Sequence, residues 1–425
     1  MIRNEVFTND KKEVTKVKNK GKRAILAIQH VIAMFGATVL VPILTGLNPA
    51  VALLAAGVGT LLFHFVTKGK VPVFLGSSFA FIPVIIAVGD KFGSLAYAQG
   101  GIMVAGALYL LLSLLIMVFG VDRVKSFFPP VVTGPMIIVI GLILSPTAIE
   151  MASANWLVAF IVIATVMVFS IFGKGMFKVI PILCGVIVGY AVSAMMNIID
   201  FSAVTEASLF HIPDATLPKF DLGAIAMIAP IVLAVFMEHI GDITTNGSVV
   251  GKNFFKDPGL HRTLMGDGLA TMFAGFIGAP PNTTYGENTS VLAVTKNYDP
   301  SILRLAAIFA IALSFIGKVG AILQTIPAPV MGGVSIILFG MISSVGIRTI
   351  SNADIDFSNN RNLIIVSIIL VAGIGTKMLD ANPDFHGTIG IQITENIQII
   401  GLSLAALIGV IANKILPEIK NEEVA

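Results

Sequence analysis

Two acidic side chains, Glu238 and Glu287, lie in stretches of the chain that are otherwise apolar. Glu238 interrupts the apolar run 225–243, and Glu287 follows the segment 280–284, where two prolines and three polar residues break the helical pattern. An ionisable group in lipid is costly, so it normally faces a protein interior or a watery cavity. Backbone that is not helical is tolerated at membrane depth only where it lines such a cavity. The two features together predict a buried polar binding site in a membrane transporter.

Glu238 has a second carboxylate, Asp242, four residues further on, with His239 beside it. Residues four apart share one face of a helix. Two carboxylates facing one low-dielectric site repel each other, which favours a proton on one of them. The alternative is that the group lies at a helix end in water, which suits Asp242 better than Glu238. The pattern predicts a site that takes up and releases a proton during transport.

The segment around Glu287 predicts a helix that begins at Gly286. Such a start would aim the free N–H groups of Gly286 and Glu287 into the cavity, where they favour a polar or anionic group. The alternative is an ordinary external loop with Glu287 in water. Apolar residues on both sides of the segment favour the site.

A second turn-rich segment, 76–81, reads Gly-Ser-Ser-Phe-Ala-Phe and follows Pro72. It predicts extended backbone whose N–H groups need a partner within the membrane, and a ligand carbonyl is one candidate. The alternative is a Ser-rich helix face that packs closely on a neighbour. His30, in the first apolar run, either bonds to the carboxylates of the 225–243 run or only satisfies a backbone carbonyl.

The composition of the chain is that of a protein embedded in lipid. Of 425 residues, 56% are hydrophobic and 12% are charged, about half the charge of a soluble domain. Runs such as 95–120 are long enough to cross a bilayer, which takes about 20 residues. A single cysteine, Cys184, excludes an intrachain disulfide and a multi-cysteine metal site. The chain is predicted to be a polytopic membrane protein.

We expect an all-α protein of about 14 transmembrane segments. Residues 1–23 are basic and precede a full span, so they predict a cytoplasmic tail and not a signal peptide. Lys and Arg gather in alternate connections, which places both termini in the cytoplasm. The basic residues flank apolar spans, so no nucleic-acid partner is expected. The predicted spans are 24–45, 49–67, 72–88, 95–119, 130–149, 155–172, 177–199, 222–245, 263–279, 286–296, 303–325, 328–347, 361–376 and 392–414.

Similar stretches recur about 200 residues apart. Segment 130–141 matches 329–340, Gln29-His30 matches Glu238-His239, and the two turn-rich segments correspond to each other. An offset of seven spans is odd, so the second copy must be inverted in the membrane. Inverted repeats with paired broken helices indicate a secondary transporter with a site near the membrane midplane.

The chain resembles the nucleobase–cation symporter-2 family, also called the nucleobase–ascorbate transporters, and within it the bacterial uracil-transporting branch. The matching stretches are QHVIAMFGATVLVPILTGLNP, VPVFLGSSFAFI, EHIGD, KDPGLHRTLMGDGLAT, PNTTYGENTSVLAVTK and IPAPVMGGVSIILFGMI. The resemblance implies two inverted repeats of seven spans, with short β-strands in spans 3 and 10. It also implies a core domain from 24–125 and 218–326 and a gate domain from 126–217 and 327–425.

By the same resemblance, Glu238 and Glu287 accept hydrogen bonds from a pyrimidine base. The backbone N–H groups of Phe79 and Gly286 donate to its carbonyls, and the rings of Phe79 and Tyr285 contact it. Uracil needs acceptors and donors together, because it offers both N–H and C=O groups. The family further implies a homodimer.

Two positions bear on the substrate. Glu287 stands where purine-transporting relatives usually have glutamine, which favours uracil. Asp242 stands where uracil members have histidine and xanthine or urate relatives have aspartate, so a xanthine or urate permease is the alternative. An anion transporter of the same fold is less favoured, because no Arg or Lys meets an anion at the site.

The expectation is therefore a proton-coupled symporter of the cell membrane that imports a nucleobase, most simply uracil. Glu238, Asp242, Glu287 and His30 are the candidates for proton coupling, with H⁺ and the lipid bilayer as partners. No metal cluster, nucleophile motif or phosphate loop is visible, so no cofactor and no enzymatic activity are expected.

Overall fold

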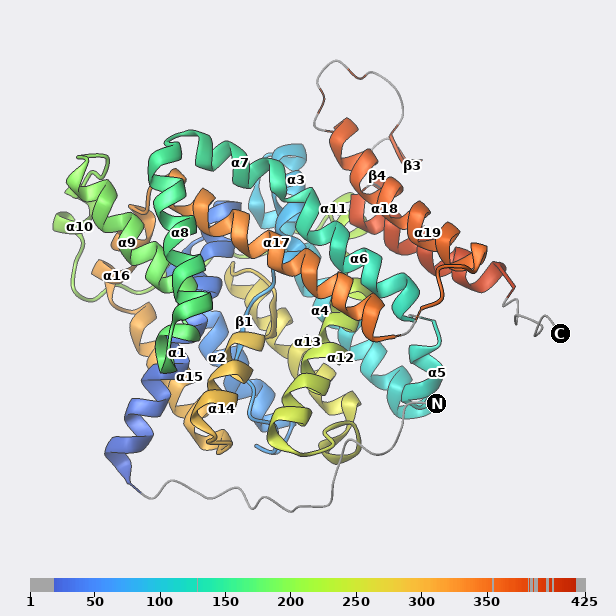
Figure 1. Ribbon diagram of the computed structural model, residues 1–425, viewed down its shortest axis with the longest axis horizontal. Coiled ribbons are helices and arrows are strands. Elements are labelled where there is room, and N and C mark those ends of the chain that lie inside the picture. The colour runs from blue at the N-terminus through green and yellow to red at the C-terminus, as the bar shows by residue number, and fades with distance from the viewer. Residues whose placement is uncertain are drawn as a thin grey trace.

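In the residues that it describes, the computed structural model of the protein is mostly helical, with four short strands (Figure 1). Most of the predicted N-terminal tail lies outside the residues that it describes. The described residues are 19–127, 129–353, 355–380, 382, 385, 389–394, 397–399 and 401–417.

The elements follow one another in two series. The first series is α1 (Lys20–Thr45), α2 (Pro49–Val66), β1 (Leu75–Ser77), η1 (Phe79–Phe81), α3 (Ile82–Phe92), α4 (Leu95–Phe119), α5 (Val121–Lys125), α6 (Pro130–Ile143), α7 (Ser145–Ser153), α8 (Trp156–Phe172), η2 (Gly175–Lys178), α9 (Pro181–Met195) and α10 (Ser202–Glu206). The second series is α11 (Leu222–Ile228), α12 (Ile231–Val250), η3 (Phe255–Gly259), α13 (Leu260–Ile277), β2 (Asn282–Thr284), α14 (Gly286–Thr295), α15 (Pro300–Ser314), α16 (Gly317–Gln324), α17 (Ala328–Asn352), α18 (Asn360–Asp380), β3 (Ile391–Thr394), β4 (Ile397–Ile399) and α19 (Gly401–Ile415).

The second series repeats the order of the first. Each half has two helical spans, a span made of a strand and a short helix, and four further helical spans. Seven helical stretches in the described residues are long and apolar enough to cross a membrane, and four shorter apolar helices accompany them. The predicted fold class, with short strands in spans 3 and 10, is confirmed.

Three predicted spans are not single continuous helices. The span 222–245 lies within one apolar stretch, Leu222–Val250, which is interrupted between α11 and α12 at Ala229-Pro230, because proline lacks an N–H and crowds the preceding turn. The span 303–325 is broken between α15 and α16, where Phe315 O accepts from His211 N and Gly317 N donates to Leu209 O. Loop residues thereby satisfy the backbone groups that the break frees.

The third of these spans, 392–414, begins with a hairpin and not a helix. Strands β3 and β4 pair in antiparallel fashion, and α19 begins only at Gly401. The sequence Ile391-Gln392-Ile393-Thr394 alternates apolar and polar residues, which is typical of a strand. Two smaller corrections are that α7 is a separate helix after α6 and that α9 ends at Met195.

The helices pack as two groups (Figure 1). In one group α13 lies against both α4 and α2, and α15 packs on α2 and α1. In the other group α17 packs on α6, α7 and α8, and α18 packs on α6 and α19. The repeated segments 130–141 and 329–340 thus lie on α6 and α17, two helices in direct contact.

Helices α4 and α13 approach closely at glycine positions. A Cβ atom added to Gly268 would lie 2.9 Å from the Cβ of Tyr109 and 3.0 Å from the carbonyl oxygen of Gly106. Small residues are used in this way where helix backbones meet in a membrane. This contact holds the Tyr109 side chain, which is 1% exposed, against the helix that carries Asp267.

We predict that Gly268→Ala lowers the free energy of unfolding by about 1–3 kcal/mol, since the added methyl group overpacks the α4–α13 contact. Gly340→Ala is the matched control, because a Cβ atom there would meet nothing within 4 Å. Thermal unfolding of both purified variants in detergent measures the effect. Equal midpoints for the two variants would contradict the close contact.

Candidate functional site

Two buried strands from opposite halves of the chain form the centre of the candidate site. Strand β1 pairs with β2 in antiparallel register, with Leu75 opposite Thr284 and Ser77 opposite Asn282. Two further backbone bonds extend the pairing, from Ser78 N to Pro281 O at 2.8 Å and from Tyr285 N to Phe74 O at 3.1 Å. The backbone groups that a helix would satisfy internally are satisfied here by the other segment.

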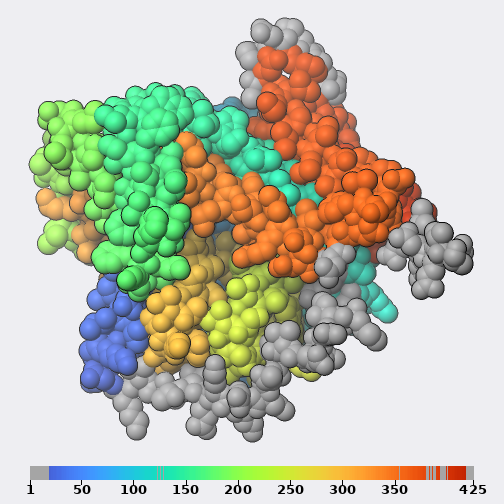
Figure 2. Space-filling model, in the orientation of Figure 1, coloured from blue at the N-terminus to red at the C-terminus, as the bar shows by residue number. Residues whose placement is uncertain are grey.

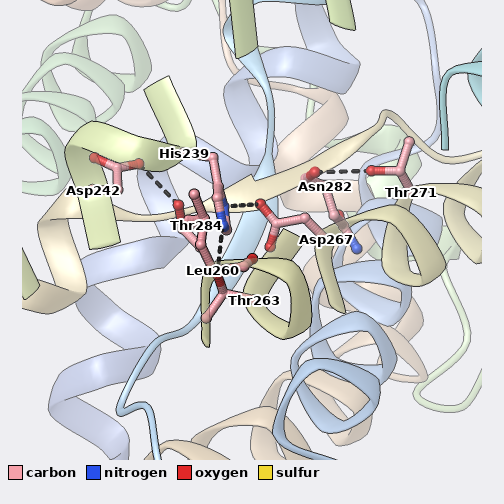
Figure 3. A network of polar contacts seen from close by, with 8 residues as sticks. All are labelled: His239, Asp242, Leu260, Thr263, Asp267, Thr271, Asn282 and Thr284. Atoms are coloured by element: carbon pink, nitrogen blue, oxygen red, sulfur yellow. Dashed lines mark hydrogen bonds and ion pairs between the residues drawn. The ribbon is translucent and has the colours of Figure 1, made fainter. Parts of the chain in front are cut away.

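Helix α2 supports both strands from behind. The backbone N–H of Leu75 donates to Thr60 Oγ1 at 2.9 Å, and the side-chain amide of Asn282 donates to the carbonyl of Ala55 at 2.9 Å. On α13, the Thr271 hydroxyl donates to Asn282 O at 2.9 Å (Figure 3). Side chains of α2 and α13 therefore fix the strand pair.

Tyr285 joins the strand pair to α1. Its hydroxyl donates to Ser77 O at 2.9 Å, and the Ser77 hydroxyl donates to Thr38 O at 2.9 Å. The Tyr285 ring lies over Gly76, where a Cβ atom would collide with it. The buried ring was predicted to contact a ligand, and in this structure it packs within the strand pair.

Each strand is followed by the start of a helix. Strand β2 leads to Gly286 at the start of α14, as the sequence predicts. Strand β1 leads to Phe79 at the start of η1, so the extended backbone predicted for 76–81 ends at Ser78 and is wrong for 79–81. Among the described residues no side chain caps either start. Helix starts without such a cap present free N–H groups to a ligand.

The Phe79 side chain lies where three apolar clusters meet. It is half-buried and packs against a cluster that includes Phe81 and Phe236, a second that includes Phe74, and a third that includes Val334 of α17. The candidate site therefore adjoins both groups of helices.

The three predicted carboxylates gather at these helix starts. Glu238 and Asp242 lie on α12 and Glu287 lies in the first turn of α14, and all three are half-buried. Glu238 lies within electrostatic range of Glu287 and of Asp242. Asp242 Oδ2 accepts a hydrogen bond of 3.0 Å from the Thr284 hydroxyl (Figure 3), so it contacts the strand pair and is not at a free helix end.

His30 has a partner that the sequence did not indicate. The side-chain amide of Asn288 on α14 donates to His30 Nδ1 at 3.1 Å and to His30 O at 3.0 Å. Bonding of His30 to the α12 carboxylates is not what the structure shows. His30 therefore links α1 to α14 and not to α12.

Asp267 on α13 pairs with His239 on another helix, α12, as is usual for an acidic residue buried in a membrane span. Its Oδ2 lies 2.8 Å from His239 Nδ1, and His239 Nε2 lies 2.9 Å from Thr263 Oγ1 (Figure 3). The exposed fractions of the His239 and Asp267 side chains are 1% and 3%. This group ties α12 to α13 behind β2.

Sequence reasoning missed Asn246 as part of this region and did not predict the partners of Thr284 and Asn288. Asn246 donates to Pro72 O at 3.0 Å and to Thr289 Oγ1 at 3.1 Å, which joins α12 to both broken spans. Polar residues inside apolar runs were the available signal. Their partners lie far away in the sequence and were not predictable from spacing.

Residues 21–381 match the model of a permease family. The chain belongs to the nucleobase–cation symporter-2 family. It is thus a multi-pass membrane permease.

Curated relatives match along almost the whole chain. The chain is 42% identical to a probable uracil permease of Haemophilus influenzae over 413 residues, 95% of this chain and 96% of the relative. It is 42% identical to a uracil permease of Bacillus subtilis over 417 residues, 93% of each. A putative pyrimidine permease of Escherichia coli is 39% identical over 382 residues, 86% of each.

Solved structures share the fold at low identity. The transmembrane domain of the cyanobacterial bicarbonate transporter BicA has a TM-score of 0.60 and 13% identity, covering 86% of this chain and 98% of that one. The structure of SLC26A9 has a TM-score of 0.69 and 10% identity, covering 93% of this chain and 65% of that one. These structures have the same inverted-repeat fold.

We predict that Tyr285→Phe lowers the free energy of unfolding by about 1 kcal/mol, because Ser77 O loses its buried donor. Tyr298→Phe is the control, since the Tyr298 hydroxyl has no hydrogen bond to the described residues and is only half-buried. Thermal unfolding in detergent compares the two. A Tyr285→Phe midpoint no lower than that of Tyr298→Phe would rule out this role of the hydroxyl.

Proposed function

We propose that the chain is a proton-coupled symporter that imports uracil. The observation that carries the proposal is the meeting of half-buried carboxylates and free helix-start N–H groups at one strand pair. The carboxylates of Glu238 and Glu287 accept from the ring N–H groups, and the backbone N–H groups of Phe79 and Gly286 donate to the carbonyls. Uracil has both kinds of group in one plane.

The relatives support this substrate. Seven of the curated relatives that match along most of the chain are named uracil permease or probable uracil permease. A xanthine or urate permease stays the alternative within the family. Asp242 is the residue that favours this alternative, and the side chain of Asp242 contacts β2 through its bond to Thr284.

Anion transport is supported only by the fold. The structural neighbours that are titled bicarbonate or anion transporters are at most 13% identical to this chain. Glu238, Asp242 and Glu287 lie at the candidate site, and an anion there would face their charge. Carboxylates suit a ligand that donates hydrogen bonds.

Proton coupling in this proposal runs through Glu238, Asp242 and Glu287, with His30 bonded behind α14. Glu238 holds a proton when uracil binds from outside, and proton and base leave inside. The core domain (24–125 and 218–326) and the gate domain (126–217 and 327–425) move relative to each other around the site. Both termini face the cytoplasm, the membrane is the cell membrane, and two copies form a homodimer.

We predict that labelled uracil accumulates in proteoliposomes that carry this protein when an inward proton gradient is imposed, and that excess xanthine leaves the uptake unchanged. The physical reason is that protonated Glu238 removes one buried charge as the base binds. Empty liposomes and collapse of the gradient by an ionophore are the controls. Uptake that xanthine abolishes would assign a purine-type site in place of the uracil site.

Glu287→Gln is expected to reduce uracil uptake at least tenfold, because an amide placed at one ring N–H offers a neutral acceptor and a clashing donor. Glu150→Gln is the matched control, since Glu150 is exposed on α7. Initial uptake rates at equal amounts of protein in the membrane measure the effect. Full uptake by the Glu287→Gln protein would refute the bond from Glu287 to the base.

A further inference from the structure

His239 is a buried imidazole with a partner on each ring nitrogen, and none of the three residues of this group belongs to the proposed uracil contacts. Nδ1 lies 2.8 Å from Asp267 Oδ2, and Nε2 lies 2.9 Å from Thr263 Oγ1 (Figure 3). We refer to His239, Asp267 and Thr263 as the triad. His239 directly follows Glu238 on α12, and the triad lies behind β2.

The positions of the hydrogens follow from the partners. The Thr263 hydroxyl donates its single hydrogen to Leu260 O at 2.9 Å. Thr263 Oγ1 is then an acceptor, so His239 Nε2 must carry a hydrogen. The contact between Nδ1 and Oδ2 needs one further hydrogen, which resides either on the ring or on the carboxyl group.

In both of these arrangements the triad has no net charge. The other assignment, with Thr263 donating to Nε2, leaves Asp267 as an anion beside a neutral ring. Asp267 is 2% exposed, and its Oδ1 has no hydrogen-bond partner in the part of the chain that the structure describes. A buried carboxylate without a compensating charge is costly, so the neutral assignment is favoured.

The other ionisable groups that interact electrostatically with Asp267 are acidic or uncharged, and Arg262, next to Thr263 on α13, donates to Val66 O instead. Glu238 and Asp242 face the triad from α12, and Tyr109 faces it from α4. His64 of α2 is occupied by a bond of 2.9 Å to Val73 O. The strand β2 contributes Thr284, which bonds to Asp242. The charge on Glu238 therefore interacts with the triad, and none of the groups that interact with Asp267 is a Lys or Arg that would offset it.

We propose that the triad is a neutral proton-holding unit that sets the pH at which Glu238 exchanges its proton. When Glu238 is ionised the shared hydrogen resides on Nδ1, which places a positive ring beside it. When Glu238 takes up a proton the shared hydrogen moves to Asp267 Oδ2, so one N–H bond breaks as one O–H bond forms. The three side chains are positioning residues that do not touch the base, and their role rests on the proposed proton coupling.

Thr263→Val tests the proposal. Valine has nearly the same shape but offers no acceptor to Nε2, so the triad loses that hydrogen and acquires a negative charge next to Glu238. The pH midpoint above which gradient-driven uracil uptake falls should then rise by about one pH unit. Thr263→Ser keeps the acceptor and should keep the midpoint, while uracil exchange without a gradient should continue in both variants.

Thr45→Val is the matched control, because Thr45 is also a buried threonine in a span and its hydroxyl bonds to Val41 O within α1 without contacting His239. It should keep the wild-type midpoint. Thr263→Ala replaces Thr263→Val if the latter does not fold, with the same expected rise. A Thr263→Val midpoint equal to that of Thr45→Val, or an equal rise in Thr263→Ser, would overturn the proposal.

The test separates this inference from the proposed function. If wild-type uptake does not respond to a proton gradient, the proposed coupling fails on its own. The pH midpoint of equilibrium uracil binding to purified protein then replaces the uptake midpoint. An unchanged binding midpoint in Thr263→Val would overturn the role of the triad, whereas a rise of about one pH unit would support it.

Discussion

Backbone hydrogen bonding between two non-helical segments is the constraint on which the rest of this structure depends. Neither β1 nor β2 can satisfy its own N–H and C=O groups, and lipid offers no partner. Each strand is only three residues long, so the bonds at Ser78 and Tyr285 and the side chains of Thr60 and Asn282 complete the pairing. Because the strands come from opposite halves of the chain, their pairing also holds the two repeats together.

The antiparallel pairing places the two helix starts at opposite ends of the strand pair, and the two central carboxylates differ in their position on their helices. Glu287 lies in the first turn of α14, where the helix dipole favours a negative charge. Glu238 lies in the interior of α12 and receives no such stabilisation from its own helix. The neighbouring His239 and Asp267 remain neutral as a unit. This difference favours Glu238 as the group that changes its protonation state and Glu287 as a constant acceptor.

The sequence indicated the broken spans because proline and small polar residues interrupt apolar runs there. The start of α14 at Gly286 was predictable for the same reason. The break at Ala229-Pro230 carried a similar signal but lay within a run apolar enough to read as one helix. The break between α15 and α16 had no local signal of that strength, because a distant loop at 209–211 provides its hydrogen bonds.

Partners within the site were the least predictable part. The spacing of Glu238 and Asp242 places both on one helix face, and the structure agrees. Spacing says nothing of which helix His30 meets, and Asn288 lies 258 residues away. The His239–Asp267 pair joins residues 28 apart on the two helices α12 and α13. Such pairings depend on helix packing, which apolar periodicity leaves undetermined.

The fold itself provides positive charge at the site, since two helix starts point their N–H groups toward it. Proteins titled as bicarbonate and anion transporters share this fold, although they are at most 13% identical to this chain. In this chain Glu238, Asp242 and Glu287 line the same place, which opposes an anion. What remains favourable is a neutral ligand that accepts from the helix starts and donates to the carboxylates. The substrate class is therefore decided by a few side chains and not by the fold.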